Sequence, residues 1–376
     1  MNKPVSFLTI KDLPPSELKG KRVLVRVDFN VPIKDSVVTD DFRLVKSLPF
    51  IDFLAQAGAK VILVSHLGYE GASLLPVAEW LNERRPITFC ELFPDAEFSH
   101  QLTEGSVSLL NNLRLYTGEV SNETFFTNRL VSLADIYINE AFSASHRVHA
   151  SIVSVPKLLP AYAGPLFVEE FTELTKLFSA EKPFVLILGG AKFSTKVPLL
   201  KKYLTVADKI FVLGAIAHGF LKKKGLPIGQ SLLEDEALFA DFTDLAKFVL
   251  PVDGIMGQEN ENESKKIEAV GPTDIIYDAG PETIKLIEDA VKEAKTILWN
   301  GPLGNFEKGF EAGTLAVAKI MAEASGYSVV GGGDTIAAIQ KLNLESKFGF
   351  MSTAGGAMLD FLSTGTLPGI EALKNS

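Results

Sequence analysis

Basic side chains that recognise anions are concentrated in the first 150 residues of this chain. All eight arginines precede residue 148, and four of the five histidines, all except His218, precede residue 150. Arginine is the side chain best suited to bidentate recognition of phosphate or carboxylate. The distribution either reflects drift in composition or indicates that the first half binds an anionic ligand that the second half does not bind.

Polar residues in the first half directly follow apolar runs. They are Asp28 and Asn30 after one run, His66 after another, and the segments 112–114 and 146–149. A single histidine after a strand is usually structural. Arginine or histidine at several separate strand ends is better explained by one anionic ligand shared between those loops.

Glycine-rich turns mark the second half, at residues 189–192, 331–335 and 355–356. Each leaves backbone N–H groups unblocked at the start of an expected helix, which makes an anion site. One such turn more often reflects tight packing, but three in one domain favour a nucleotide. The chain contains neither GxxxxGK[ST] nor GxGxxG after a strand, so we expect neither a P-loop nor a dinucleotide fingerprint.

Three charged residues accompany these turns. Lys192 and Lys196 are four residues apart and lie near one face of an early helical turn. They are either surface charge or groups that neutralise a transferring phosphoryl group. Asp334 begins a helix, where it either caps the N-terminus or holds Mg²⁺ together with substrate phosphates.

The elements that must position these residues alternate along the chain. We expect strands at residues 21–27, 60–64, 107–110, 135–139, 184–188, 209–213, 275–278, 296–299 and 327–330, and helices at 48–57, 282–294 and 313–324. Short apolar runs of this kind are typical of parallel strands buried on both faces. The alternation predicts an α/β fold with doubly wound parallel sheets and right-handed crossovers.

A chain of 376 residues is too long for one core, so we expect two domains. Prolines and a glycine interrupt the alternation near residues 156–165, and one helix without a strand partner follows. The first domain is therefore placed at 1–165, a connecting helix at 166–180 and the second domain at 181–362. The polar stretch 257–266 is expected to be an exposed loop.

Composition narrows the function classes. The net charge of −9 argues against extensive nucleic-acid binding. Cys90 is the only cysteine, which excludes a disulfide framework or a cysteine-rich metal site and indicates a reducing, cytoplasmic compartment. No signal-peptide pattern opens the chain and no stretch is apolar for the length of a membrane span, so we expect no membrane partner.

Motifs from both halves occur in one characteristic order. They are RVDFNVP (26–32), GAKVILVSHLG (58–68), NLR with a following GE (112–119), AFSASHRVHAS (141–151), LGGAKFSTK (188–196), DAGPET (278–283), WNGPLGNFE (299–307), GGGDT (331–335) and STAGGA (352–357). Over essentially its whole length the chain resembles the phosphoglycerate kinase family.

The resemblance implies a fold and a reaction. The fold is two doubly wound, Rossmann-like domains joined by a connecting helix, with an active-site cleft between them and a C-terminal tail, 363–376, packed on the first domain. The reaction is reversible, Mg²⁺-dependent phosphoryl transfer between ATP and the carboxylate of 3-phosphoglycerate in glycolysis and gluconeogenesis. The N-terminal domain would bind the acid and the C-terminal domain the nucleotide. The resemblance also implies a monomer that bends at a hinge.

The resemblance also implies the site residues. Those for the acid and its phosphate are Asp28, Asn30, Arg43, His66, Arg114 and Arg147. Those for the nucleotide are Gly190, Lys196, Asn300, Pro302, Glu307, Gly332, Gly333, Asp334 and Thr335, with Glu307 at the ribose and Asp334 at the magnesium ion. The groups expected to grip the transferring phosphoryl oxygens are Arg43, Lys192, Lys196, Gly355 and Gly356.

Some positions depart from the family pattern. Tyr69 stands where the family has an arginine that contacts the substrate phosphate. The loss of one such contact costs on the order of 1.5–3 kcal/mol, so we expect weaker binding of the acid. The stretch 213–215 replaces a glycine pair and is expected to alter the adenine pocket. Ala354 replaces a common glycine and would strain a backbone that needs positive φ.

Two other functions stay open at this point. One is a nucleotide-binding relative that has lost turnover and acts through a partner. The other is a two-domain solute-binding protein, which would need a signal peptide. The charged groups of the motifs, which a decayed enzyme would lose first, are all present and favour the kinase.

Overall fold

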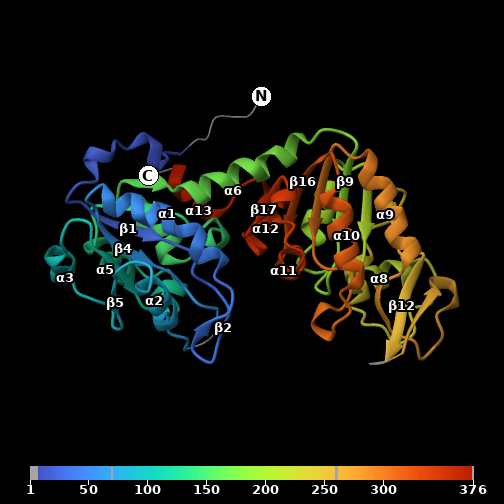
Figure 1. The fold of residues 1–376 in the computed structure, drawn as a ribbon. Coiled ribbons are helices and arrows are strands. Elements are labelled where there is room, and N and C mark those ends of the chain that lie inside the picture. The colour runs from blue at the N-terminus through green and yellow to red at the C-terminus, as the bar shows by residue number, and fades with distance from the viewer. Residues whose placement is uncertain (1–6, 69–70, 259–260, 375–376) are drawn as a thin grey trace. The chain divides into compact units, whose positions relative to one another are not determined.

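Two six-stranded parallel sheets organise the chain, one in each of two units (Figure 1). The computed structural model describes residues 7–68, 71–258 and 261–374. Unit 1 comprises Met1–Thr172 with Thr364–Ser376, and unit 2 comprises Glu173–Ser363. The predicted α/β class with two parallel-sheet domains is confirmed.

The sheet of unit 1 has the strand order β5-β6-β4-β1-β7-β8, with all neighbours parallel. Its strands are β1 (Arg22–Arg26), β4 (Lys60–Val64), β5 (Thr88–Cys90), β6 (Val107–Leu110), β7 (Ile136–Asn139) and β8 (Ala161–Ala163). The central strands are mostly apolar and buried because both faces of the sheet are covered. A hairpin of β2 (Ile33–Lys34) and β3 (Val37–Val38) follows β1.

The helices of unit 1 include one from the C-terminal end of the chain. They are α1 (Phe42–Gln56), α2 (Leu75–Asn82), α3 (Ala96–Gln101), α4 (Thr117–Val120), α5 (Thr124–Ser132) and α13 (Pro368–Lys374). Helix α1 begins before the predicted start at residue 48, because Pro49 in its interior conceals the first turns from the sequence pattern. In α13 the N–H of Gly369 donates to the carbonyl of Ser145 at 2.9 Å.

The sheet of unit 2 has the order β11-β10-β9-β15-β16-β17 and is also fully parallel. Its strands are β9 (Phe184–Leu188), β10 (Lys209–Val212), β11 (Phe248–Val249), β15 (Thr296–Asn300), β16 (Tyr327–Gly331) and β17 (Phe350–Ser352). Every residue of β9 and β15 is buried, as expected for the centre of a covered sheet.

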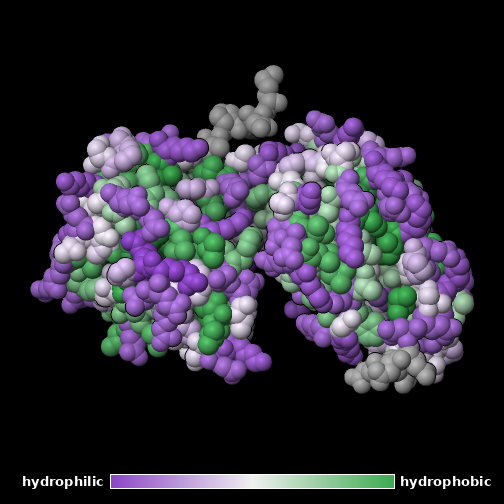
Figure 2. Space-filling view, in the orientation of Figure 1, coloured by the Kyte–Doolittle hydropathy of each residue, from purple (hydrophilic) through white to green (hydrophobic). Residues whose placement is uncertain are grey.

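The helices of unit 2 shield this sheet from solvent. They are α7 (Val197–Tyr203), α8 (Ala215–Lys223), α9 (Pro281–Glu293), α10 (Ala312–Ala322), α11 (Gly333–Lys341) and α12 (Gly356–Thr364). The exposed face of α9 pairs Lys285 with Asp289 at 2.7 Å and Lys292 with Glu288 at 2.6 Å, and Figure 2 shows a hydrophilic strip over this helix. In the described part of the chain, no helix combines the length and apolar character needed to cross a membrane.

The prediction of an exposed loop at residues 257–266 is wrong. Strand β12 (Asp253–Gln258) pairs antiparallel with β13 (Glu261–Lys266) and with β14 (Ile276–Ala279), and this small sheet lies beside the parallel one (Figure 1). The pattern was misleading because an edge hairpin with solvated faces needs no apolar alternation; its strength comes from the backbone ladder. The strand expected at 275–278 is therefore antiparallel.

The connecting helix α6 (Pro165–Thr175) continues into a 3-10 turn, Lys176–Ser179. The buried carboxylate of Glu140 holds its start: Oε2 accepts the N–H groups of Leu166 at 2.8 Å and Phe167 at 3.2 Å. Burial raises the pKa of Glu140 to about 8, although both N–H donors oppose the shift. The division between the two units falls within α6, after Thr172.

Candidate functional site

The residues predicted to bind the acid lie after neighbouring strands of unit 1. Asp28 and Asn30 follow β1, His66 follows β4, Arg114 follows β6 and Arg147 follows β7. The carboxyl ends of parallel strands meet at one edge of a sheet, so the topology brings these loops together. Tyr69 lies outside the described residues, and its predicted effect stays a prediction.

Asp28 organises one side of this edge. It forms an ion pair with Arg43, from the first turn of α1, and its Oδ2 accepts the hydroxyl of Ser143 at 2.5 Å. The Oδ1 atom of Asn30 accepts the N–H of Gly68 at 2.9 Å, which joins the loops after β1 and β4. Burial raises the pKa of Asp28, but Arg43 and the other partners outweigh it and hold the pKa below its usual value. Asp28 is therefore a carboxylate that orients Arg43.

A buried arginine that the sequence analysis did not assign lies beside His66. Arg26 is 1% exposed, and its Nη2 donates to His66 Nδ1 at 3.1 Å. A guanidinium only donates, so the neutral ring carries its proton on Nε2. Burial, followed by the charge of Arg26, lowers the pKa of His66 well below its usual value. His66 is thus a neutral group with an Nε2–H available to an acceptor.

Positive charge exceeds negative charge around these residues. Burial and then the charges of Arg147 and Arg26 lower the pKa of Arg114. Burial and then Arg114 lower the pKa of His149 to about 4. An anion that binds among basic groups stabilises their charged forms, which neighbouring positive charge disfavours. This edge therefore has the electrostatics of an anion site.

The buried carboxylate of Glu119 is linked to the basic cluster through Ser151. The two oxygens of Glu119 accept the hydroxyl of Ser151 at 2.6 Å and its N–H at 2.9 Å, while Arg26 Nε donates to the same hydroxyl at 3.0 Å. Glu119, Arg26 and His149 all fall inside the motifs that carried the resemblance. Their types and motif membership were available signals, but spacing alone did not show that they converge.

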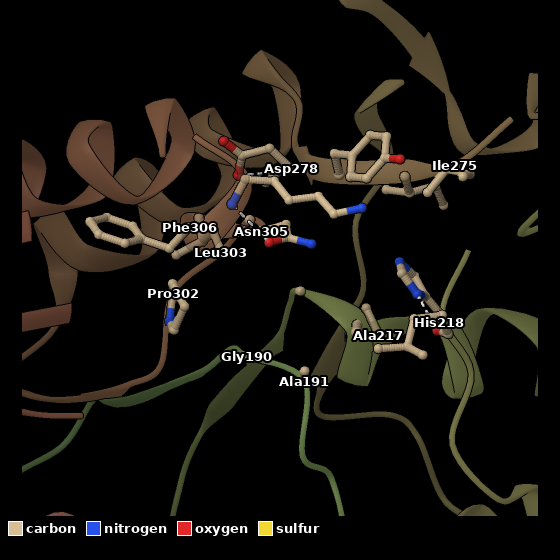
Figure 3. A pocket seen from close by; sticks show the side chains of 18 of the residues that line it. Gly190, Ala191, Ala217, His218, Ile275, Asp278, Pro302, Leu303, Asn305 and Phe306 are labelled. Atoms are coloured by element: carbon tan, nitrogen blue, oxygen red, sulfur yellow. Dashed lines mark hydrogen bonds between the residues drawn. The ribbon is translucent and has the colours of Figure 1, made fainter. Parts of the chain in front are cut away.

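Unit 2 contains a cavity of about 540 Å³ at the carboxyl ends of its central strands. Figure 3 shows this cavity with Gly190 and Pro302 at its border. Of the residues predicted to bind the nucleotide, Gly190, Pro302, Glu307 and Asp334 line it. The remaining five, which do not line the cavity, are Lys196, Asn300, Gly332, Gly333 and Thr335.

The glycine turns serve two different purposes. A Cβ on Gly189 would lie 2.1 Å from the carbonyl oxygen of Pro302, so this glycine permits close packing of two loops. Gly190 has φ +90°, and its N–H donates to the same carbonyl at 2.7 Å. By contrast, a Cβ on Gly333 or Gly355 would meet nothing within 4 Å. Those two positions border open space, where a ligand can approach the backbone.

The two lysines of the first turn have different surroundings. Lys196 is 8% exposed, and a Cβ on Gly190 would lie 3.2 Å from its Nζ. Burial lowers the pKa of Lys196 to about 8, against the opposing charges of Glu234 and Asp334. Lys192 is exposed at the surface. Only Lys196 is therefore held in place against the glycine turns.

Glu234, which the sequence analysis did not single out, holds this turn. Its Oε2 accepts the N–H groups of Phe193 at 2.6 Å and Ser194 at 3.1 Å. The ring of Phe193 stacks on that of Phe239 with centroids 4.3 Å apart. A Cβ on Gly219 would lie 2.1 Å from that second ring, so glycine at 219 makes the stacking possible. Aromatic packing and the carboxylate of Glu234 therefore hold the turn in place.

Asp334 lies in the first turn of α11 but does not cap it. The N-cap is Gly332, without a side-chain capping bond. Burial and the nearby charge of Glu307 raise the pKa of Asp334, while Lys196 lowers it. Among the described residues, no group of three or more His, Cys, Asp or Glu side chains is arranged to hold a metal ion. One carboxylate, that of Asp334, is enough for a Mg²⁺ ion that is also bound by the substrate phosphates, so the residues present fit this ion.

The last glycine turn precedes α12. Ser352 at the end of β17 pairs with Gly331, so this turn neighbours the one that begins α11. Gly355 has φ +55°, whereas Ala354 is not among the residues with positive φ. The strain predicted at Ala354 is therefore absent, because the left-handed residue is the glycine that follows it.

Comparisons with known proteins cover nearly the whole chain. A family model described as phosphoglycerate kinase matches residues 10–365. Phosphoglycerate kinase of Dictyoglomus turgidum is 42% identical to this chain, over 98% of this chain and 99% of that protein. The structure of phosphoglycerate kinase from Coxiella burnetii is similar with a TM-score of 0.85 at 38% identity, and that from Pyrococcus horikoshii with 0.88 at 28%, each over 98% of both chains.

Proposed function

The chain belongs to the phosphoglycerate kinase family, and from this premise we propose that it transfers a phosphoryl group reversibly between ATP and the carboxylate of 3-phosphoglycerate. The observation that carries the proposal is the division of chemistry between the two sheet edges. Unit 1 has a basic cluster in which burial and neighbouring arginines lower the pKa values of His66, Arg114 and His149, as suits a site for a small polyanion. Unit 2 has a glycine-bordered cavity with Lys196 and Asp334 nearby.

The acid is assigned to unit 1. Arg114 and Arg147 supply donors for its phosphate, and the Nε2–H of His66 and the amide of Asn30 supply further polar contacts. Asp28 keeps Arg43 oriented through their ion pair. The carboxylate oxygen of the bound acid attacks the γ-phosphorus of ATP in line. The reaction therefore needs no covalent intermediate with the enzyme.

The nucleotide is assigned to unit 2. Glu307 is suited to the ribose hydroxyls, and the N-terminus of α11 with Gly332, Gly333 and Thr335 is suited to the phosphates. Asn300 ends β15, and Pro302 lies in the loop that follows it. Asp334 would hold Mg²⁺, which when bound supplies charge neutralisation at the phosphates.

The transferring phosphoryl group carries negative charge that several donors would share. Lys196 is the group held most firmly, and Arg43, Lys192 and the N–H groups of Gly355 and Gly356 complete the proposed set. These groups belong to both units, and we propose that the protein bends at α6 during its reaction. We further propose a cytoplasmic monomer that uses neither a nucleic-acid nor a membrane partner.

Initial rates against 3-phosphoglycerate at saturating Mg·ATP test the proposal. Saturable turnover establishes the activity. If the protein binds ATP but produces no turnover with the acid, the kinase proposal fails and an impaired nucleotide-binding protein takes its place.

A Tyr69→Arg variant belongs in the same experiment. An added guanidinium that contacts the substrate phosphate lowers KM for the acid by about tenfold or more, from a charge-assisted contact of roughly 1.5–3 kcal/mol. The matched variant Tyr69→Gln, which adds no charge, leaves KM near the parent value. Equal KM values for all three proteins would show that this position does not contact the acid.

A further inference from the structure

The cavity of unit 2 has ends of different character. Figure 3 shows Pro302 and Phe306 on one side, and Ala217, His218 and Ile275 on the other. The second side is completed by Leu221 of α8 and by Leu232. With the phosphates assigned to the glycine turns, this mainly apolar side is the place for the base, since flat aromatic ligands bind between apolar side chains.

Two buried polar side chains line the cavity, Asp278 and His218, which are 3% and 4% exposed. The oxygens of Asp278 are occupied, because Oδ1 accepts the N–H of Ala279 and Oδ2 accepts that of Gly313, each at 2.8 Å. Asp278 therefore holds the backbone around the cavity in place. Among the described lining residues, His218 is the buried side chain with only one of its two polar atoms, Nδ1, in a hydrogen bond of the protein.

One nitrogen of His218 is already in use. Its Nδ1 lies 2.7 Å from the carbonyl oxygen of Leu232, and a carbonyl only accepts, so Nδ1 carries the proton. Burial lowers the pKa of His218, which keeps the ring neutral near pH 7. Nε2 then presents a lone pair, and in the described part of the chain it has no hydrogen-bond partner. Figure 3 shows the ring facing the cavity.

We propose that His218 selects the base of the nucleotide: its Nε2 accepts a hydrogen bond from the 6-amino group of adenine and thereby disfavours 6-oxopurines. The 6-amino group is the only N–H donor on the adenine edge. Hypoxanthine and guanine carry an oxygen at that position, which would place two acceptors against each other. A polar group built to bond one substrate is left unpaired by the other, and this is a strong source of discrimination.

The inference rests on the proposed function, because only a nucleotide substrate brings a base to this cavity. It also follows from a local feature of this chain. Nδ1 of His218 is anchored to Leu232, on a segment that also lines the cavity, so the tautomer is set before any ligand arrives. An acceptor oriented in advance costs no reorganisation on binding.

The test compares kcat/KM for Mg·ATP and Mg·ITP at a fixed concentration of 3-phosphoglycerate. ITP differs from ATP at the 6-position and N1 without the additional 2-amino group of GTP. We expect the parent to prefer ATP by at least about tenfold, the effect of one unpaired buried group. In His218→Leu the ratio falls toward one, and in His218→Gln, whose amide can both donate to Leu232 and accept from the base, much of it returns.

Leu221→Val is the matched control, since it changes the shape of the same cavity without changing its hydrogen bonds. It alters the rates with ATP and ITP by the same factor. Loss of overall stability in a His218 variant would likewise affect both nucleotides alike, so the ratio separates recognition from folding.

The outcomes distinguish the two proposals. Absence of turnover with both nucleotides in the parent contradicts the proposed function. Turnover with an ATP to ITP ratio that is the same in the parent and in His218→Leu overturns the role of His218 while leaving the function intact. If neither His218 variant folds, calorimetric binding of ADP and IDP to the parent decides: a tenfold preference for ADP supports the proposal, and equal affinity overturns it.

Discussion

Both sheets are six-stranded and parallel, but their carboxyl edges have different chemistry. In unit 1 the edge is made of side-chain charge, and burial together with the charges of Arg26 and Arg114 lowers the pKa of His66. In unit 2 the edge is made of backbone, with Gly190 and Gly332 at positive φ and one buried lysine, Lys196. The same fold class thus provides two different anion sites.

The difference matches what each edge has to hold. A small acid with several charges is bound most strongly by fixed guanidinium groups, which need no large cavity. A nucleotide has a bulky base and sugar, so its site needs space, and glycines provide that space while their N–H groups still meet phosphate oxygens. If this contrast is correct, substitutions that remove charge and substitutions that alter the glycine backbone have different effects in the two units.

The largest effect is expected at Lys196, the one buried lysine among the described residues of unit 2. Lys196→Met removes charge from the transferring phosphoryl group and lowers kcat by about 10²–10³, as for the loss of one preorganised electrostatic donor. Steady-state kinetics measure it. Lys201→Met, on the exposed face of α7, the helix that follows Lys196, is the control and keeps kcat near the parent value. A kcat for Lys196→Met within threefold of the parent would contradict the assignment.

Unit 1 should lose stability rather than only rate when its charge is removed. Arg26→Met leaves Glu119 buried without its cation and breaks the bond to Ser151, which costs about 3 kcal/mol of unfolding free energy. Urea denaturation measures the change. Arg84→Met removes an exposed guanidinium that lies over Trp80 and costs about 0.5–1 kcal/mol. Similar losses for both variants would show that burial of Arg26 is unimportant.

An anion bound at unit 1 should raise the pKa of His149 from its depressed value of about 4. The depression comes from burial and then from Arg114 and other basic groups, so an added negative charge offsets the second cause and shifts the pKa upward by about one unit. NMR titration of the histidine rings with and without inorganic phosphate measures this shift. His218 in unit 2, whose pKa is lowered mainly by burial, serves as the internal reference. A shift of both rings, or of neither, would remove the distinction between the two edges.

The smallest effect concerns the backbone of the last glycine turn. Gly355→Ala places a side chain at φ +55°, where nothing obstructs it sterically, so it costs about 1 kcal/mol from conformational strain alone. Ala354→Gly, at a position without positive φ, costs about 0.5–1 kcal/mol from the entropy of the unfolded chain and relieves no strain. Thermal denaturation compares them. A stabilising Ala354→Gly would restore the original expectation of strain there.

Much of the fold followed from local pattern. Strands such as β4, β6 and β9 lie where apolar runs predicted them, because both of their faces are covered and most of their residues are therefore apolar. The hairpin of β12 and β13 was missed because its polar strands satisfy the backbone without a buried face. Helix α1 was recognised only in part because of its internal proline.

The candidate site was predictable by type but not by arrangement. Motifs identified Lys196 and Asp334. Only the three-dimensional structure shows that Lys196 is buried and that Asp334 does not cap α11. Glu234 was missed because its partners are about 40 residues away and its segment carries no recognisable motif. His218 looked like an isolated histidine, and its chemistry depends on the carbonyl of Leu232 fourteen residues further on.

The position of α13 has a consequence for the order in which the protein is made. Unit 1 contains residues from both ends of the chain, and Ala372 belongs to the same apolar cluster as Ala141 and Ile152. On the ribosome, unit 2 is therefore the first to have all its residues synthesised, although it comes second in sequence. The apolar cluster of unit 1 is complete only after the residues of α13 have been synthesised. The unit that comes first in the sequence is therefore the last one that can complete its fold.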